Sequence, residues 1–350
     1  MSLKYISKFA ILLIAISSMP FAQAQRRLFG NSDIKDKPFK MVDASPLGAN
    51  YAYTYGPSII FSEGKYHAYY CSTGAGSLDW DHIRYSESKD LIHWTSPESI
   101  VQSTRLERAA CDPSVVRFDA GDGLYYYMMF SGNILDVQTV NFIARSKNPS
   151  GPFYRYTDRR TWEQNPHDSK VMVWPKVAAP EGSNIYGAGQ ASLVVVGDTI
   201  YQWFTDTTVT GKNLILLNKS KDMINWTRAV ITNAETSSID VKYDEAKNDF
   251  VMIEILNQHT DHSILSFRRS PDGITWTKSQ IINDEKHFPK WANNPGMSGN
   301  EQGHLIGNKA LVAYGAPFDL SPQYTSNDCN VSPSPYCWGH WDLYGQFVSF

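Results

Sequence analysis

Cysteine is scarce in this sequence, and no long apolar segment follows its N-terminal region. The 350 residues include four cysteines, and no CxxC spacing occurs, so a disulfide interpretation is favoured over a zinc site. The formal net charge of −3 gives no argument for binding nucleic acid or an anionic membrane surface. A nucleophile elbow, a phosphate-binding loop and an HExxH motif are also absent. These absences exclude the chemistries that such motifs carry.

The N-terminus has the features of an export signal. Lys4 and Lys8 precede an apolar run over residues 9–16, and the small-x-small sequence Ala22-Gln23-Ala24 follows. The run is too short to span a bilayer. We therefore predict a signal peptide over residues 1–24, cleavage near Ala24, and a secreted or periplasmic protein.

An exported protein can form disulfides. Cys329 and Cys337 flank the short loop CNVSPSPYC, and we predict that they pair. Cys71 and Cys111 are then left as a candidate second pair.

Three stretches repeat one pattern, Ser-x-Asp-x-Ile-x-Trp-Thr. They are SKDLIHWT (88–95), SKDMINWT (220–227) and, with Gly before the Ile, SPDGITWT (270–277). Ser and Asp side chains at such spacing accept hydrogen bonds from nearby backbone amides and fix a turn. We expect the Ile and Trp to point into a packed layer where the next strand starts. SKNPSGPFYRY (146–156) is a looser copy in which Phe153 replaces the Trp.

Strand-like runs with Gly- or Asn-containing turns precede each of these corners. Five such units begin near Pro57, Pro113, Gln190, Ser238 and Gly303. Four short strands per unit, repeated radially, predict an all-β, five-bladed β-propeller as one domain over residues 25–350. The final segment HWDLYGQFVSF, or the segment after Gln25, is expected to close the ring by pairing with the other end.

The chain resembles the five-bladed β-propeller glycosidases, most closely glycoside hydrolase family 43 and its relatives. CDPSVVRFDAGDGLYYYMMFSG, the Ser-Asp-Trp corners, SGPF and GNEQGHLIGN carry the resemblance. It implies three acidic residues around a central cavity, one from each of the first three blades. Asp112 in CDPS matches the second of these positions. Gly56 in YGPS and Gln190 in GQAS stand at the other two, where the family pattern has carboxylates.

A second carboxylate is expected from elsewhere, because glycoside hydrolysis uses two. Asp240 in SSIDVKYD opens the fourth unit and is the predicted catalytic partner of Asp112, with Glu181 and Glu301 as further candidates. Gly56, Gln190 and Trp203 are the predicted substrate contacts.

The resemblance also places His304, in QGHLIGN, near the propeller axis and close to a bound cation or water. No cofactor is expected to be required, although a structural calcium ion near the axis would suit hard oxygen ligands. The predicted partner is a polysaccharide or oligosaccharide, and we expect a monomer without a membrane span.

These observations predict a secreted glycoside hydrolase. The alternatives are a carbohydrate-binding propeller that has lost its catalytic residues, and a structural or adhesion role without a deep cavity. A cavity with two carboxyls favours the enzyme, and a lone Asp112 favours binding.

Overall fold

Short strands joined by turns build the part of the chain that the structure describes. The computed structural model describes residues 37–44, 52–73, 81–104, 107, 109–134, 138–166, 169–178, 185–317 and 340–350. Every regular element among them is a strand, which confirms the prediction of an all-β chain. No helix there is long and apolar enough to cross a membrane. Contacts divide the chain into two units, Met1–Pro38 and Phe39–Phe350, and nearly all described residues belong to the second.

The strands fall into groups that follow one another along the chain and pair antiparallel within each group. The first group comprises β2 (Ala52–Ser62), β3 (Lys65–Ser72), β4 (His82–Ser88) and β5 (Glu98–Val101). The second comprises β6 (Cys111–Asp119), β7 (Leu124–Ile134), β8 (Gln138–Ser146), β9 (Tyr154–Tyr156) and β10 (Trp162–Glu163). The third comprises β11 (Ala188–Val196), β12 (Thr199–Asp206), β13 (Leu214–Ser220) and β14 (Val230–Glu235).

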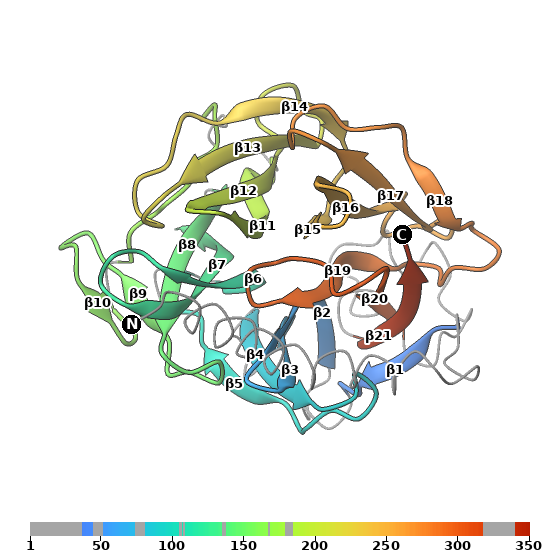
Figure 1. Ribbon diagram of the computed structural model, residues 1–350, viewed down its shortest axis with the longest axis horizontal. Coiled ribbons are helices and arrows are strands. Elements are labelled where there is room, and N and C mark those ends of the chain that lie inside the picture. The colour runs from blue at the N-terminus through green and yellow to red at the C-terminus, as the bar shows by residue number, and fades with distance from the viewer. Residues whose placement is uncertain are drawn as a thin grey trace, which may run out of the picture. The chain divides into compact units, whose positions relative to one another are not determined.

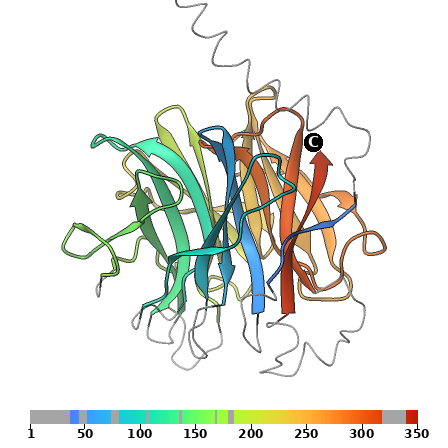
Figure 2. The ribbon, with the colours of Figure 1, turned by 90° about the horizontal axis from the view of Figure 1, so that it is seen from below.

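The fourth group comprises β15 (Ile239–Asp244), β16 (Asp249–Leu256), β17 (Ile264–Ser270) and β18 (Gln280–Asn283). The last comprises β19 (Asn293–Asn300), β20 (Lys309–Pro317), β21 (His340–Ser349) and β1 (Phe39–Val42). Figure 1 shows β2, β6, β11, β15 and β19 nearest the centre of the arrangement. Seen from the side in Figure 2, neighbouring strands run alongside one another.

The first and last described segments share one sheet. β1 pairs antiparallel with β21, and β19 pairs in parallel with β2, so the first and last groups form a continuous eight-stranded sheet. Lys40 and Asp342 add an ion pair of 2.6 Å across the β1–β21 edge. The expected closure by the two ends of the chain is confirmed.

The cores lie between neighbouring groups. The cluster containing Ile60 and Tyr69 from the first group also contains Val115 and Phe130 from the second. Other clusters are likewise shared between neighbouring strand groups, because the sheets bury apolar side chains against each other. The inner strands are held in place from both sides.

The Ser-Asp-Trp corners are hydrogen-bonded turns, as predicted. In the first, the Ser88 hydroxyl accepts the Leu91 N–H at 2.9 Å, and Asp90 accepts the N–H groups of Ile92 and His93. The 220–227 and 270–277 corners repeat these bonds. One detail differs from the prediction in the first corner: the left-handed Leu91 is buried, and Ile92 is 40% exposed.

The fifth unit begins earlier than predicted. Its inner strand, β19, starts at Asn293, and the Gly303 region is the turn that follows it. The sequence NNPGMSGN lacks strand-forming residues because close contacts require small ones. A Cβ at Gly296 would lie 1.8 Å from the Pro57 carbonyl oxygen.

Candidate functional site

Four of the five inner strands open with the same backbone distortion. Gly56, Asp112, Gln190 and Asn294 all have φ between +43° and +60°. The pairing register shifts beside each of them, as in a β-bulge. Bulges re-aim side chains and are frequent next to active sites. β15 has regular pairing, and Ser238 precedes it at the corresponding position.

These bulges surround a pocket at the centre of the ring. Its enclosed volume is about 20 Å³, room for about one water molecule, and the pocket opens to solvent. All five inner strands or their first turns contribute to it. The lining residues are Gly56, Pro57, Asp112, Pro113, Ser114, Gln190, Ala191, Ser238, Ile239, Asp240, Asn294 and Pro295. Asp112 and Asp240, the predicted catalytic pair, therefore line one pocket, as do Gly56 and Gln190.

Asp112 is fixed by partners from other parts of the ring. The Asn294 amide donates to its Oδ1 at 2.6 Å, and the Tyr186 hydroxyl lies 3.4 Å from its Oδ2. Its backbone N–H donates to the sulfur of Cys71. Cys71 and Cys111 form a disulfide, which confirms the candidate second pair. The disulfide links β3 to β6 directly beside the carboxyl.

Gly56 provides the room that this arrangement needs. A Cβ at Gly56 would lie 2.9 Å from Asp112 Oδ1 and 3.6 Å from the amide nitrogen of Asn294. A side chain at Gly56 would therefore crowd the Asp112 carboxyl. Gly189 does the same for Tyr186, whose hydroxyl would lie 2.4 Å from a Cβ there.

The proton affinity of Asp112 is unusual. Burial, together with the nearby charge of Asp81, raises the pKa of Asp112 to about 7, although hydrogen bonds from Asn294 and Tyr186 oppose the shift. Burial also raises the pKa of Asp81 to about 6. The Tyr53 hydroxyl donates to Asp81 at 2.6 Å. Two carboxyls with elevated pKa values are typical of functional sites.

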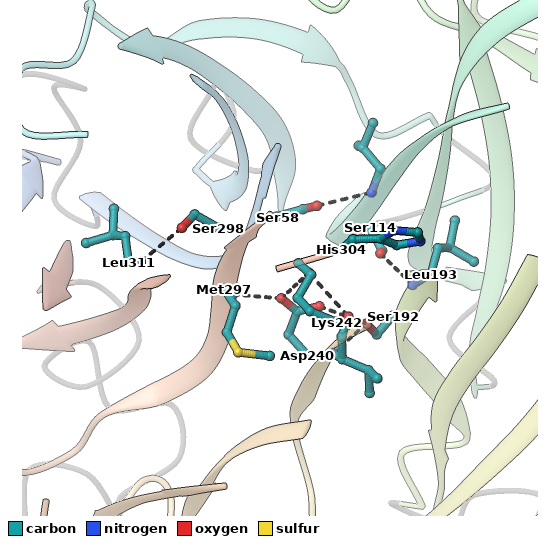
Figure 3. A network of polar contacts seen from close by, with 12 residues as sticks. Ser58, Ser114, Ser192, Leu193, Asp240, Lys242, Met297, Ser298, His304 and Leu311 are labelled. Atoms are coloured by element: carbon teal, nitrogen blue, oxygen red, sulfur yellow. Dashed lines mark hydrogen bonds and ion pairs between the residues drawn. The ribbon is translucent and has the colours of Figure 1, made fainter. Parts of the chain in front are cut away.

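Asp240 occupies a different position in the repeated strand. Ser58, Ser114 and Ser192 each accept a backbone N–H from the next inner strand, at 2.8–3.1 Å. Asp240 does the same for the Met297 N–H at 2.6 Å. Figure 3 shows this network of polar contacts. We call Ser58, Ser114 and Ser192 the seam serines, because each joins two neighbouring inner strands. Asp240 occupies the same position in β15, two residues beyond the position that corresponds to Asp112.

Asp240 is also ion-paired. Lys242 lies 2.5 Å from its Oδ2, both side chains are buried, and the Ser192 hydroxyl donates to its Oδ1 at 2.7 Å. A carboxylate offers about four acceptor sites. Three are occupied here, which leaves one for a group in the pocket.

His304 and Glu301 belong to a turn that hydrogen-bonds to the far ends of three inner strands. Carbonyls of residues 301–303 accept the N–H groups of Arg117, Val195 and Tyr243. Both ring nitrogens of His304 are engaged, by Glu245 and by the Val195 carbonyl. Both nitrogens face oxygen partners rather than an open site for a cation, and we do not retain His304 as a metal ligand. A calcium ion elsewhere near the axis stays a prediction.

Two other predicted residues also lie outside the pocket. Glu301 contacts Arg117 and Ser62 at the ends of the inner strands. Trp203 is fully buried against Phe250 and Trp276, and its indole donates to the Gly273 carbonyl. Its ring offers no surface to a substrate because it fills the core between the third and fourth groups, so we withdraw it as a substrate contact.

Some sequence predictions fall on residues that the structure does not describe: Glu181, the Cys329–Cys337 pair and the leader at residues 1–24. In the described part, Cys71, Cys111 and Asp112 cluster closely enough to suggest metal ligands. The two sulfurs are joined to each other, so they do not supply thiolates.

Three residues of the site were missed in the sequence. Asn294 could have been found, because NNPG repeats the phrase of YGPS and CDPS. Asp81 and Tyr186 follow no such phrase, and only the fold brings them close to Asp112.

Comparison with known proteins supports the resemblance to glycosidases. A model of the glycosyl hydrolases family 32 N-terminal domain matches residues 56–193. No curated protein sequence matches the chain.

Solved structures share the fold over most of the chain. An N-acetylgalactosamine deacetylase from F. plautii, in complex with blood group B trisaccharide, is 17% identical, with a TM-score of 0.59 over 91% of this chain and 94% of its own. Zg3597, a family 117 glycoside hydrolase from Zobellia galactanivorans, is 14% identical, with a TM-score of 0.59 over 89% of each chain. A thermostable family-43 glycoside hydrolase is 13% identical, with a TM-score of 0.54 over 85% and 89%. The predicted resemblance to family 43 and its relatives is confirmed at the level of the fold.

Proposed function

We propose that this protein is a secreted, five-bladed propeller glycoside hydrolase that cleaves a glycosidic bond at the axial pocket. The observation that carries the proposal is that Asp112 and Asp240 line one pocket in opposite electrostatic settings. We assign the strand groups to five blades of four or five strands, which divides the eight-stranded sheet between the first and last blades. The similar glycosidase structures support the same reaction class.

The two carboxyls are assigned different roles in glycoside hydrolysis, one as the acid and one as the base or nucleophile. Asp112 has a pKa of about 7 and keeps its proton in near-neutral solution, so it can serve as the general acid toward the leaving oxygen. Asp240 lies 2.5 Å from the Lys242 ammonium and is the proposed base or nucleophile. A carboxylic acid with a raised pKa and a second carboxyl in the same pocket are the groups that glycoside hydrolysis needs.

The pocket also holds neutral polar groups that can orient hydroxyls. Gln190 lies 3.4 Å from Asn294, and the Ser238 hydroxyl donates to the same Asn294 oxygen. Amide and hydroxyl groups recognise sugars without adding charge. The substrate class that fits is therefore a neutral oligosaccharide or polysaccharide.

The test is a screen of the purified protein against a polysaccharide and oligosaccharide panel, followed by Asp112→Asn. The panel includes N-acetylated sugars because one similar structure is a deacetylase. The variant keeps the Oδ1 acceptor for Asn294, so it should fold. Loss of the acid should reduce turnover by about 10²–10⁴-fold. Full turnover by the variant would overturn the assignment of Asp112.

A non-catalytic sugar-binding protein is the second candidate. It is favoured by Gly56 and Gln190, which stand where the resemblance implies carboxylates. Calorimetry distinguishes the two: binding of an oligosaccharide by the wild type, with no product from any substrate in the panel, would establish binding alone.

A further inference from the structure

One large aromatic side chain is exposed on a segment that runs from the second group of strands to the third. Trp174 is 64% exposed, and Val177, three residues later, is 48% exposed. Tyr186, at 37%, follows on the return to β11. Exposed apolar side chains that gather near a pocket commonly mark a binding site.

The backbone around Trp174 is held firmly. Asn141 on β8 donates to the Val173 carbonyl at 3.1 Å and accepts the Met172 N–H at 2.8 Å. Two residues later, the Lys176 N–H donates to Asp206 at 2.8 Å. The Val173 side chain packs in a buried cluster with Ala188 and Phe204. Trp174 is therefore displayed on a built framework between β8 and the end of β12.

This framework continues to the axial pocket. Thr139, two residues before Asn141 on β8, donates to the Tyr186 carbonyl at 2.8 Å. The attachment points of the two aromatic residues are thus about 7 Å apart along one strand. Tyr186 extends from there until its hydroxyl meets Asp112, at 3.4 Å. Its ring links the exposed segment to the mouth of the pocket.

We propose that Trp174 and Tyr186 form an aromatic subsite that binds further sugar units of the oligosaccharide whose bond is placed at Asp112. This inference rests on the proposed function. The apolar C–H faces of a pyranose ring are flat enough to stack on an indole, and a rigid ring loses little entropy on binding. The subsite selects chain length rather than bond chemistry, because neither side chain supplies a charge.

The experiment compares Trp174→Ala with wild type on oligosaccharides of increasing length. Loss of one aromatic contact should raise KM for the longer substrates by roughly 2–10-fold. The KM for the shortest substrate and kcat for all of them should be unchanged, and Trp174→Phe should restore most of the loss. Tyr154→Ala is the matched control, since Tyr154 is an aromatic side chain, 40% exposed, on β9.

The outcomes separate the two proposals. Suppose that the wild type cleaves oligosaccharides and that KM depends on chain length in Trp174→Ala as it does in the wild type. The subsite proposal is then overturned, and the proposed hydrolase activity stands. If wild type only binds them, and Trp174→Ala weakens binding of the longer ones alone, hydrolysis is overturned and the subsite stands. Failure of the wild type to bind any oligosaccharide in calorimetry would overturn both.

Discussion

Asp112 and Asp240 are the same residue type on neighbouring positions of one repeated strand, yet their surroundings differ. Asp112 stands on a bulge that lines the pocket, and among the described residues no cation is its partner. Burial raises its pKa to about 7. Asp240 stands two residues further along the corresponding strand, where β2, β6 and β11 have serine. Lys242 lies against it at 2.5 Å.

The comparison teaches that register decides what a carboxyl in this ring can do. A carboxyl on the bulge lines the pocket, and burial favours its protonated form. A carboxyl at the seam joins two strands, and it has to be accompanied by a cation because a buried unpaired charge is costly. Both line the pocket, so each can be tested separately.

The largest expected effect on stability comes from removing the cation alone. Lys242→Val leaves Asp240 buried without its partner, and breaking such a pair costs about 3–5 kcal/mol of unfolding free energy. Urea denaturation monitored by tryptophan fluorescence measures it. A change below about 1 kcal/mol would show that the ion pair contributes little to the seam.

The chain itself supplies the matched control for that variant. β11 carries Ser192 and Val194 at the positions of Asp240 and Lys242, so Asp240→Ser/Lys242→Val rebuilds one seam in the pattern of another. Stability should return to near the wild-type value, because replacing a buried ion pair is often neutral. Turnover should still be lost if Asp240 is the catalytic partner. A stable and fully active double variant would show that Asp240 has only a structural role between the two strands.

The next effect concerns how stability depends on pH. The pKa of Asp112 is about 7 in the folded chain, against an ordinary value of 3.8, so the folded state binds the proton more tightly. The resulting stabilisation is fully present below about pH 4 and is lost as pH rises through about 7. Asn cannot titrate, so Asp112→Asn should lose less stability over this window. Thermal unfolding at several pH values checks this, and parallel curves for the two proteins would contradict it.

Much of the fold could be predicted because its repeated unit carries a recognisable sequence motif. The Ser-Asp-Trp corners depend on local side chain to backbone bonds, so SKDLIHWT and its copies identify them directly. β19 was missed because NNPGMSGN lacks strand-forming residues, and Gly296 is required only by the approach of Pro57.

The site was less accessible to prediction. Asp112 could be predicted from the sequence CDPS. The position of Asp240 could not, because it depends on which inner strands contain a bulge, and β15 contains none. Trp203 packs in the hydrophobic core. The sequence alone does not distinguish such a core tryptophan from one that contacts a sugar. Asp81 and Tyr186 are brought to Asp112 by long-range folding alone.

The smallest predicted effect tests the coupling between Asp81 and Asp112. The charge of Asp81 adds to burial in raising the pKa of Asp112, so Asp81→Asn should lower that pKa. The alkaline limb of kcat/KM then moves to lower pH, by about one unit or less. Asp81 is ionised in this range, since its own pKa is about 6. Tyr53 can still donate to the Asn oxygen, so the geometry is preserved. Tyr53→Phe is the control, because it removes that hydrogen bond and keeps the Asp81 carboxyl. An alkaline limb that stays in place in Asp81→Asn, or that moves equally in both variants, would show that the carboxyls at the mouth titrate independently.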